Sequence, residues 1–338
     1  MIDNIKPKVT IIVPVFNAEK YIKKCLDSLV YQTLSNIEIV CVDDCSTDGS
    51  LEIIRQYAET DSRIRVIIHE ENLGPGVARN NGLNFARGEY IMFLDSDDWY
   101  EQDACECAYN RIKQNDNDFA IFGFNEYTES TGIYKYNNSM LRGLKEEYEN
   151  PRIILNDIEK NFIISCFGWA AIYKREFINE YNIRFPQNRH FEDQIFFQLA
   201  VLYSKTISLI NKALYNYRIR ENYLTYTYDS QHKDIFETKS IIINEMSKIT
   251  GDNNIKTALY VHAINSSIYW FKWCSSNFGS AEKVFYKNIN KIFKLLDKEY
   301  IERNVKHRLK EINYETYKCI LKYNYYQFKF MFFLKKCF

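Results

Sequence analysis

The segment Asp95-Ser96-Asp97-Asp98 carries the clearest chemical signal in the chain, because it places carboxylates two positions apart. It follows directly on an apolar run at residues 90–94, and such a run predicts a buried strand. The acids then stand at the carboxyl end of a strand, where open α/β sheets bind their ligands. Hard divalent cations take oxygen ligands, so the pattern fits a metal that in turn binds a diphosphate. The alternative is a solvated turn whose aspartate caps a helix beginning near Glu101.

Two further acidic pairs are predicted to close strands of their own. Asp43-Asp44 follows the apolar run at 37–42, and Glu192-Asp193 closes a later segment. The first predicted strand ends at residues 14–17, Pro-Val-Phe-Asn. A parallel sheet brings such strand ends to one edge, so these turns are expected to converge there. Solvation explains one acidic turn more easily than several on the same edge.

Strands and helices are predicted to alternate over the first 125 residues. Apolar runs indicate strands, and apolar residues at 3.6-residue spacing indicate helices. The expected strands are residues 9–15, 37–42, 64–68, 90–94 and 119–124. The expected helices are residues 21–30, 49–58, 76–86 and 102–113. This alternation predicts an α/β fold with a mostly parallel sheet that helices cover on both faces.

Beyond residue 125 the pattern changes. The polar stretch 128–150 is expected to be a loop or insertion near the site, and helical patterns are found at 169–173 and 193–202. From residue 230 onward only helical spacing is found. We therefore predict an α/β domain over residues 1–225, made of a nucleotide-binding part (8–125) and an acceptor or catalytic part (126–225), followed by a helical region over 226–338.

The composition is that of a globular protein, with 46% hydrophobic residues, 26% charged residues and zero net charge. A chain without excess positive charge is not expected to bind nucleic acid. The nine cysteines form no C-x-x-C pair, which predicts reduced thiols rather than disulfides or a zinc site. There is no signal-peptide pattern and no apolar run of about 20 residues, so we expect a cytoplasmic protein without a membrane-spanning helix.

Four segments carry motifs whose order and spacing are specific. They are IIVPVFN at 11–17, VDDCSTDG at 42–49, NLGPGVARNNG at 72–82 and GEYIMFLDSDD at 88–98. Together they resemble the inverting family 2 glycosyltransferases, which have the GT-A fold. The resemblance covers residues 8–125 and continues more weakly toward residue 220. It implies a nucleotide-sugar-binding sheet and a sugar-transfer activity.

The resemblance implies a nucleotide pocket. Pro14, Phe16 and Asn17 would line this pocket, with Phe16 beside the base. Asp44, with Asp43 next to it, would accept a hydrogen bond from the uracil ring. Uracil offers an N–H donor and an ionised carboxylate is an acceptor only, so the two groups are complementary.

The same resemblance implies the catalytic groups. Arg79 would lie near the nucleotide and the aspartates, and Ser96 would lie on the donor side between Asp95 and Asp97. Those two aspartates would form a D-x-D motif that contacts the donor and holds Mn²⁺ or Mg²⁺, which neutralises the leaving diphosphate. Asp193 would take the proton from an acceptor hydroxyl as that oxygen attacks the anomeric carbon. A single displacement of this kind inverts the configuration.

The implied reaction moves a hexose or N-acetylhexosamine from a UDP-sugar to a hydroxyl of a glycan or lipid-linked glycan. The implied setting is the assembly of a bacterial surface polysaccharide, either capsule or lipooligosaccharide. One alternative is a non-catalytic sugar-nucleotide or glycan-binding protein, which is expected to have lost one of the aspartates, and none is missing. Another is a metal-dependent nucleotidyltransferase, which is expected to have a Gly- and Lys-rich phosphate loop that residues 13–17 lack.

Three further features each have two interpretations. Trp169 fits a sugar-stacking surface or a core position. The basic segment at 216–222 fits the family's loop that closes over the diphosphate, or plain surface charge. The aromatic and basic tail at 321–338 fits a helix in the interface of the inner membrane face. It also fits packing against the helical region or against a second subunit of an oligomer.

Overall fold

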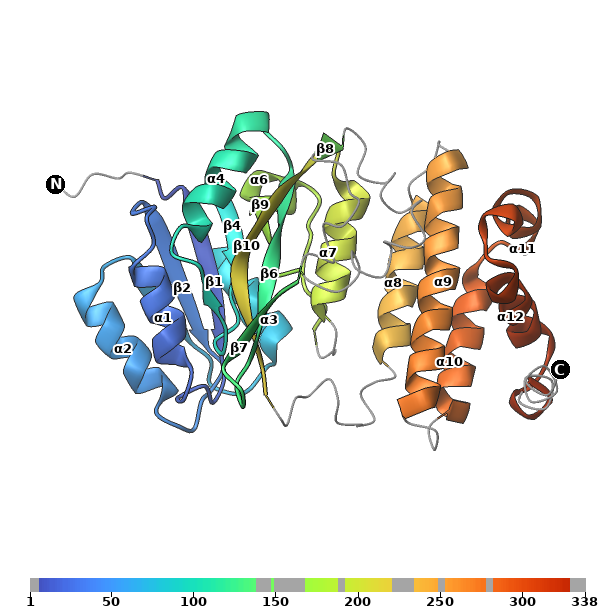
Figure 1. Ribbon diagram of the computed structural model, residues 1–338, viewed down its shortest axis with the longest axis horizontal. Helices are drawn as coiled ribbons and strands as arrows, with labels where there is room; N and C mark the ends of the chain where they lie inside the picture. The colour runs from blue at the N-terminus through green and yellow to red at the C-terminus, as the bar shows by residue number, and fades with distance from the viewer. Residues whose placement is uncertain are drawn as a thin grey trace. The chain divides into compact units, whose positions relative to one another are not determined.

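The computed structural model describes residues 6–137, 147–148, 168–187, 192–220, 234–248, 253–277 and 282–328 (Figure 1). The chain divides into two compact units. The first comprises residues 1–151 and 163–223, and the second comprises residues 152–162 and 224–338. The predicted domain boundary after residue 225 lies outside the described residues.

The first unit is built on a sheet of ten strands among the described residues. One half is parallel, in the order β3-β2-β1-β4, and comprises β1 (Val9–Val15), β2 (Ile37–Asp43), β3 (Ile64–Ile68) and β4 (Tyr90–Phe93). Every residue of β1 and β2 is buried, as expected for central strands covered on both faces. The four strands predicted for this half are confirmed to within one residue at either end.

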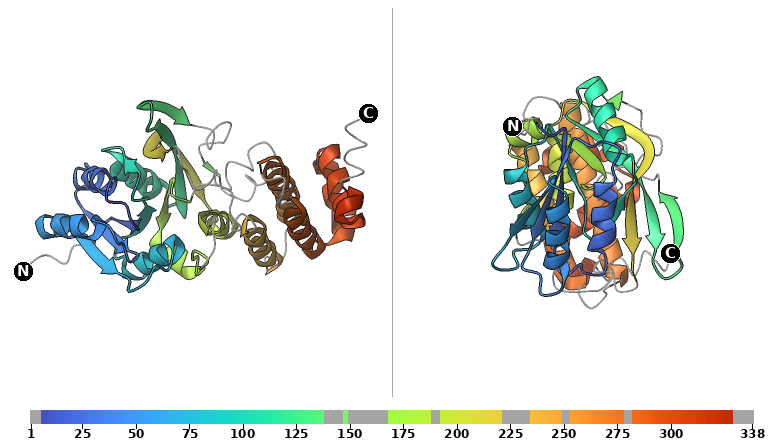
Figure 2. Two further views of the ribbon diagram at one scale, coloured as in Figure 1. Left: turned by 90° about the horizontal axis from the view of Figure 1, so that it is seen from below. Right: turned by 90° about the vertical axis from the view of Figure 1, so that its left-hand side faces the viewer.

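Four helices follow these strands in the predicted places. They are α1 (Ile22–Val30), α2 (Ser50–Thr60), α3 (Pro75–Phe85) and α4 (Ala104–Asn115), each within two residues of its predicted bounds. A later helix, α7 (Glu192–Tyr203), confirms the pattern predicted at 193–202. Figure 2 shows α1, α2 and α4 on one side of the sheet and α3 and α7 on the other. The predicted α/β sheet with helices on both faces is therefore confirmed.

The other half of the sheet is mixed rather than parallel. Strand β9 (Ala171–Lys174) runs antiparallel between β4 and β6 (Phe119–Thr128), and β10 (Ile207–Ile219) runs parallel to β6. Three short antiparallel strands complete it, namely β5 (Trp99–Tyr100), β7 (Ile133–Asn137) and β8 (Glu147–Tyr148). The short helix α6 (Arg175–Glu180) follows β9.

One prediction for this half is wrong. The pattern at 169–173 predicts a helix, but residues 171–174 form β9, because a short buried run looks the same in a strand and in a helix. The stretch 128–150 is predicted to be a loop or insertion, and its residues 133–137 form β7 as a hairpin with β6, so they are not loop. The parts of that stretch at 138–146 and 149–150 lie outside the described residues.

The described residues of the second unit contain helices and no strands, as predicted from residue 230 onward. They form α8 (Asp234–Lys248), α9 (Asn253–Asn277), α10 (Glu282–Leu295), α11 (Lys298–Tyr300), the π-helix η4 (Ile301–Val305), the 3₁₀-helix η5 (Lys306–Arg308) and α12 (Glu311–Lys322). Buried apolar residues recur every three or four positions along one face of α10, at Phe285, Ile289, Ile292 and Phe293. None of the helices in the described part of the chain is both long and apolar enough to span a bilayer.

The first part of the tail predicted at 321–338 packs within the second unit. Phe328 is 2% exposed, and its ring contacts Phe271 of α9 and Tyr286 of α10, with centroids 5.8 and 5.1 Å apart. Tyr326 is 66% exposed. The packing interpretation therefore holds for Phe328, and residues 329–338 lie outside the described residues.

Candidate active site

The carboxyl ends of β1, β2 and β4 bring three of the predicted motifs to one edge of the sheet. The register of β1 with β4 ends at Ile12 and Phe93, and Leu94 N then donates to Ile12 O. Pro14 lies beyond this ladder, so its missing N–H removes no bond to β4. Phe16, two residues on, is 47% exposed, so its ring is accessible from solvent.

Asn17 connects the turn after β1 to the turn after β2. Its φ of 49° lies in the left-handed region, which asparagine tolerates better than most residues. Its N–H donates to Ser46 Oγ (3.1 Å), and its Oδ1 accepts from Thr47 N (2.8 Å). These two hydrogen bonds tie the turn that follows β1 to the turn that follows β2.

Asp44 is buried, and protein groups already fill most of the hydrogen-bond acceptor positions of its carboxylate. Oδ1 accepts from Leu73 N (2.9 Å) and lies 2.6 Å from His69 Nδ1, while Oδ2 accepts from Gly74 N (2.7 Å). Asp43 is also buried, and its Oδ2 accepts from Ser46 N (3.1 Å). Its Oδ1 has no hydrogen-bond partner among the described residues. The roles predicted for both aspartates toward uracil stay predictions.

Arg79 connects the D-x-D segment to the start of α7. One guanidinium nitrogen, Nη2, donates to Asp95 Oδ1 and the other, Nη1, donates to Glu192 Oε1, both at 2.6 Å. The Arg79 side chain is 7% exposed. Burial alone would lower the pKa of Arg79, but the charges of Asp95 and Glu192 raise it above its usual value. Arg79 is therefore a buried, permanently charged link between Asp95 and Glu192, and Glu192 lies 113 positions from Arg79 in the sequence.

The next two residues of α3 make two more links, which the sequence did not indicate. Asn80 donates to Phe185 O (2.8 Å) and accepts from Phe185 N (3.0 Å). Asn81 Nδ2 lies 2.7 Å from His69 Nε2, so it supports the imidazole that contacts Asp44. The block A-R-N-N in the sequence was the available signal, but only its arginine was assigned a role.

Gly76 allows α3 to approach the segment before α7. A Cβ at this position would lie 2.8 Å from Pro186 O and 3.2 Å from Glu192 Cγ. Any side chain would push the two segments apart, so this close approach requires glycine. The approach brings Arg79 within reach of Glu192.

The aspartates after β4 do not cap α4. That helix begins at Ala104 with Asp103 at its N-cap, so the interpretation of this cluster as a simple capping turn is wrong. Asp98 is buried instead, where its Oδ2 accepts from Tyr215 Oη (2.6 Å) and its Oδ1 from Arg218 N (2.7 Å). Asp98 therefore anchors the turn to β10.

Asp95 and Asp97 are the accessible carboxylates of the cluster, with side chains 26% and 22% exposed. Ser96 lies half-buried between them. Asp97 pairs with Arg220, and its backbone oxygen accepts from Arg218 Nε (2.7 Å). Burial and the charge of Asp95 raise the pKa of Asp97.

These two carboxylates fit a divalent cation. They are oxygen donors, they are partly open, and the repulsion that raises the pKa of Asp97 is the kind that a bound cation relieves. Among the described residues, no group of three or more His, Cys, Asp and Glu side chains could hold a metal alone. A metal held here would therefore need further oxygen ligands from a bound molecule.

Asp193 is the second residue of α7, so the prediction that Glu192 and Asp193 close a strand is wrong. Asp193 is half-buried, and its Oδ1 accepts from Gln194 N (2.9 Å). Burial and the neighbouring Glu192 raise the pKa of Asp193, while Arg79 opposes that rise. A Cβ at position 168 would lie 3.0 Å from Asp193 O, so Gly168 packs tightly against it. Through Glu192 and Arg79, Asp193 belongs to the same cluster as Asp95.

Trp169 is a core residue. It is 5% exposed, and its ring stacks on Tyr215 and Tyr217 of β10, with centroids 4.2 and 5.5 Å apart. The ring is covered by protein, so the sugar-stacking interpretation is wrong.

The basic segment predicted at 216–222 is partly described, and its Arg218 and Arg220 contact Asp97 as given above.

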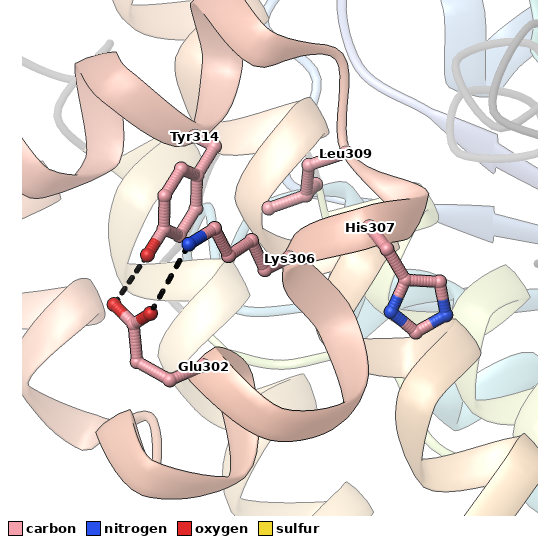
Figure 3. A pocket seen from close by; sticks show the side chains of 5 residues that line it. All are labelled: Glu302, Lys306, His307, Leu309 and Tyr314. Atoms are coloured by element: carbon pink, nitrogen blue, oxygen red, sulfur yellow. Dashed lines mark hydrogen bonds and ion pairs between the residues drawn. The ribbon is translucent and has the colours of Figure 1, made fainter.

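A separate pocket of about 300 Å³ lies in the second unit (Figure 3). Its walls are Glu302, Lys306, His307, Leu309 and Tyr314, from η4, η5, the link that follows η5 and the start of α12. Tyr314 donates to Glu302, and Lys306 Nζ lies 3.9 Å from the same carboxylate. The charged groups of this pocket therefore satisfy one another, and no residue of the predicted active site lines it.

Comparison with known proteins assigns the family. The sequence profile described as "Glycosyl transferase family 2" matches residues 10–181, which hold every predicted site residue except Asp193. The chain belongs to glycosyl transferase family 2. The enzyme is 40% identical to the glycosyltransferase GlyA of Streptococcus pneumoniae over 222 residues, covering 64% of this chain and 31% of GlyA. It spans about a third of that relative's length.

Two other similarities extend the comparison. The enzyme is 36% identical to the poly(ribitol-phosphate) beta-glucosyltransferase of Bacillus spizizenii over 219 residues, covering 64% of this chain and 33% of that protein. The crystal structure of S. aureus TarS residues 1–349 in complex with UDP-GlcNAc superposes with a TM-score of 0.74 at 24% identity. That superposition covers 93% of this chain and 90% of the TarS chain, so the two chains share a fold.

Proposed function

We propose that the enzyme transfers a hexose or N-acetylhexosamine from a UDP-sugar to a hydroxyl of a glycan acceptor, with inversion. The observation that carries this proposal is the Arg79 bridge, which joins the D-x-D carboxylate Asp95 to Glu192, next to Asp193. A donor-binding acid and a candidate base thereby share one cluster. Single-displacement transfer needs these two groups on either side of one anomeric carbon.

The donor nucleotide is assigned to the turns after β1 and β2. Pro14, Phe16 and Asn17 would line the pocket, and Asp43 and Asp44 would face the uracil. The exposed Phe16 ring and the unpaired Oδ1 of Asp43 support this assignment. TarS, which shares the fold, was crystallised with UDP-GlcNAc, and this supports uridine as the base.

Asp95 and Asp97 would hold Mn²⁺ or Mg²⁺, with Ser96 between them on the donor side. When bound, such a cation supplies positive charge to the leaving diphosphate. Arg220, which pairs with Asp97 in the structure, is placed to add a second positive charge at the same group. Arg218 holds the Asp97 backbone oxygen and so positions this side of the site.

Asp193 would accept the proton of the acceptor hydroxyl. It belongs to a helix start that the Arg79 bridge and Gly168 hold in place, and a general base must be positioned before its pKa matters. Glu192 is unsuited to that role, because it is buried and its Oε1 is paired with Arg79. The attacking oxygen forms the new bond to the anomeric carbon as the diphosphate leaves, and this inverts the centre.

The acceptor is proposed to be a bacterial surface glycan, in capsule or lipooligosaccharide assembly or a related polymer. A relative named for poly(ribitol-phosphate) supports a surface polymer as acceptor. A non-catalytic binding protein is less compatible with the site, because every carboxylate of the predicted set is retained.

The exposed Tyr326 and the basic sequence beyond it support a further proposal, contact with an anionic membrane surface. The chain should sediment with vesicles containing phosphatidylglycerol and should do so less with Lys335→Glu/Lys336→Glu. Equal sedimentation of the two proteins would remove the membrane proposal. The alternative of a second subunit predicts a concentration-dependent mass in analytical ultracentrifugation instead.

Calorimetric titration of UDP tests the donor proposal. UDP should bind in the presence of Mn²⁺, and binding should weaken strongly in excess chelator and in Asp97→Ala. A matched control is Glu59→Ala, which removes an exposed carboxylate near the end of α2, away from these turns. If UDP does not bind with or without metal, the uridine donor is wrong, whatever the fold.

A further inference from the structure

We propose that His69 is a positioning residue that fixes the Asp44 carboxylate and so sets the preference for uracil over cytosine. In this role His69 is neutral and carries its proton on Nδ1. The inference rests on the proposed donor site, and it goes beyond that site by naming the group that orients the carboxylate facing the base.

The imidazole is buried and both of its nitrogens are engaged. His69 is 8% exposed, with Nδ1 2.6 Å from Asp44 Oδ1 and Nε2 2.7 Å from Asn81 Nδ2. An ionised carboxylate only accepts hydrogen bonds, so the proton must be on Nδ1. The Asn81 amide nitrogen only donates, so Nε2 must be unprotonated. The geometry therefore selects one neutral tautomer.

The same contacts give the two carboxylate oxygens of Asp44 different numbers of hydrogen-bond donors. Oδ1 accepts from His69 and from Leu73 N (2.9 Å), whereas among the described residues Oδ2 accepts from Gly74 N alone (2.7 Å). A carboxylate oxygen can accept about two hydrogen bonds, so Oδ1 is filled and Oδ2 keeps one free position. His69 thus fixes which oxygen of Asp44 is available to a ligand.

This arrangement selects among pyrimidine bases. Uracil presents a ring N–H, which Oδ2 can accept, while cytosine presents a ring nitrogen lone pair at the same place. The cytosine lone pair would face a carboxylate that has no proton to offer. The hydrogen bond from His69 holds Oδ1 of Asp44 in place, and this keeps Oδ2 toward the base. Without that donor, the carboxylate is free to turn.

Asparagine and glutamine variants separate this role from simple packing. In His69→Asn the side-chain amide nitrogen takes the place of Nδ1, so the donor to Asp44 is retained. In His69→Gln the amide reaches toward the Nε2 position, and the donor is lost. His69→Gln should weaken UDP binding by about tenfold or more, which corresponds to a lost bond to a charged group. It should also lower the ratio of UDP to CDP affinity, whereas His69→Asn should keep that ratio near the wild-type value.

The control is His307→Gln, which changes an exposed histidine of the second unit. Thermal midpoints of all variants establish that they fold. If His69→Gln is folded and its UDP to CDP ratio equals that of the wild type, the inference is overturned. If the wild type binds no uridine nucleotide at all, the donor proposal has failed instead, so the two failures are distinguishable.

A spectroscopic measurement needs no nucleotide. The chain has five histidines, and ¹⁵N-histidine labelling with two-bond proton–nitrogen correlation reports the tautomer of each. The signal that disappears in His69→Asn should show a protonated Nδ1 and an unprotonated Nε2 at pH 7. A proton on Nε2, alone or together with one on Nδ1, would mean that the Asn81 amide presents its oxygen to the ring. The neutral positioning role would then be wrong.

Discussion

At the scale of single residues, Arg79 shows why a guanidinium is needed at the centre of the cluster. Its two terminal nitrogens donate in separate directions, one to Asp95 and one to Glu192, each at 2.6 Å. An ammonium group is a single point and cannot reproduce this planar fork. The arginine was identified from the sequence, but its partner Glu192 was not, because a contact over 113 residues has no local signal.

Arg79→Lys should therefore lose one of the two ion pairs while it keeps the charge. We expect kcat/KM to fall about tenfold to a hundredfold, the range for losing a hydrogen bond to a charged partner. The measurement is sugar transfer or donor hydrolysis, with the thermal midpoint as a check on folding. The matched control is Arg63→Lys in the turn after α2, where the arginine pairs with Asp61. Full activity in Arg79→Lys would show that a point charge is sufficient.

The pH dependence of transfer should report on Asp193. Burial and Glu192 raise its pKa, so a larger fraction of Asp193 is protonated at a given acidic pH than for an ordinary carboxyl. A base must be ionised, so kcat should fall as the pH is lowered, and the fall should begin nearer neutrality than ordinary carboxyl titration would give. Asp193→Asn should abolish this limb and lower kcat by about a thousandfold, within the range for general-base catalysis. An Asn variant with the wild-type profile would assign the base elsewhere.

At the scale of elements, the carboxyl ends of the strands hold the site and the amino ends hold a structural cluster. Glu38 of β2 is 1% exposed and accepts from Thr10 Oγ1 (2.7 Å), Arg87 N (2.8 Å) and Arg87 Nε (2.7 Å). Arg65 of β3 adds a bond at 3.2 Å. This cluster joins β1, β2, β3 and the segment after α3 at the edge away from the motifs.

Glu38→Gln should destabilise the first unit by about 2 kcal/mol at pH 7, since it leaves buried donors facing a neutral amide. Burial alone would raise the pKa of Glu38, but its hydrogen bonds lower it below the usual value. Its stabilising effect is thus present above the unfolded-state pKa and is lost as the pH falls through the lower folded-state pKa. Denaturant unfolding from pH 7 to pH 3 should show the two proteins converge on acidification. Glu52→Gln, on the exposed face of α2, is the control, and an equal loss there would contradict the assignment.

The elements also show what the sequence could and could not predict. The alternation of β1 to β4 with α1 to α3 was predictable, because buried parallel strands are continuous apolar runs between amphipathic helices. Strand β9 was not, because it is four residues long and lies antiparallel between β4 and β6, which are distant in sequence. The motif positions at the strand ends were predictable for the same reason as the strands. The supporting groups His69, Asn80 and Asn81 were not, because their partners are set by the fold.

At the scale of the whole molecule, the cysteine thiols divide into buried and half-buried ones. All cysteines in the described parts of the chain are free, and those of β2, α1, α4 and α9 include buried side chains. Burial raises the pKa of the Cys25 and Cys105 thiols, and it raises the pKa of Cys41 to about 12. Cys45, in the turn after Asp44, is half-buried.

Alkylation followed by peptide mass spectrometry should therefore separate two classes of cysteine. In the folded enzyme Cys45 should react, while Cys25, Cys41 and Cys105 should react only after denaturation, because the thiolate is the nucleophile. UDP with Mn²⁺ should slow the reaction of Cys45 and leave that of Cys107, a half-buried thiol of α4, unchanged. Equal labelling of the buried and half-buried thiols would contradict the packing. An unprotected Cys45 would place the nucleotide away from this turn.

Helix α3 has a consequence for how the site responds to its ligands. Consecutive residues of a helix point about 100° apart, so Arg79, Asn80 and Asn81 reach three different neighbours from a single turn. Through His69 that turn is fastened to Asp44, and through Glu192 to the residue before Asp193. Because these contacts start from one helical turn, a displacement of α3 at one of them also displaces the other two. We therefore expect a bound donor to change how readily Asp193 takes a proton, and by linkage that proton should change donor affinity by the same factor.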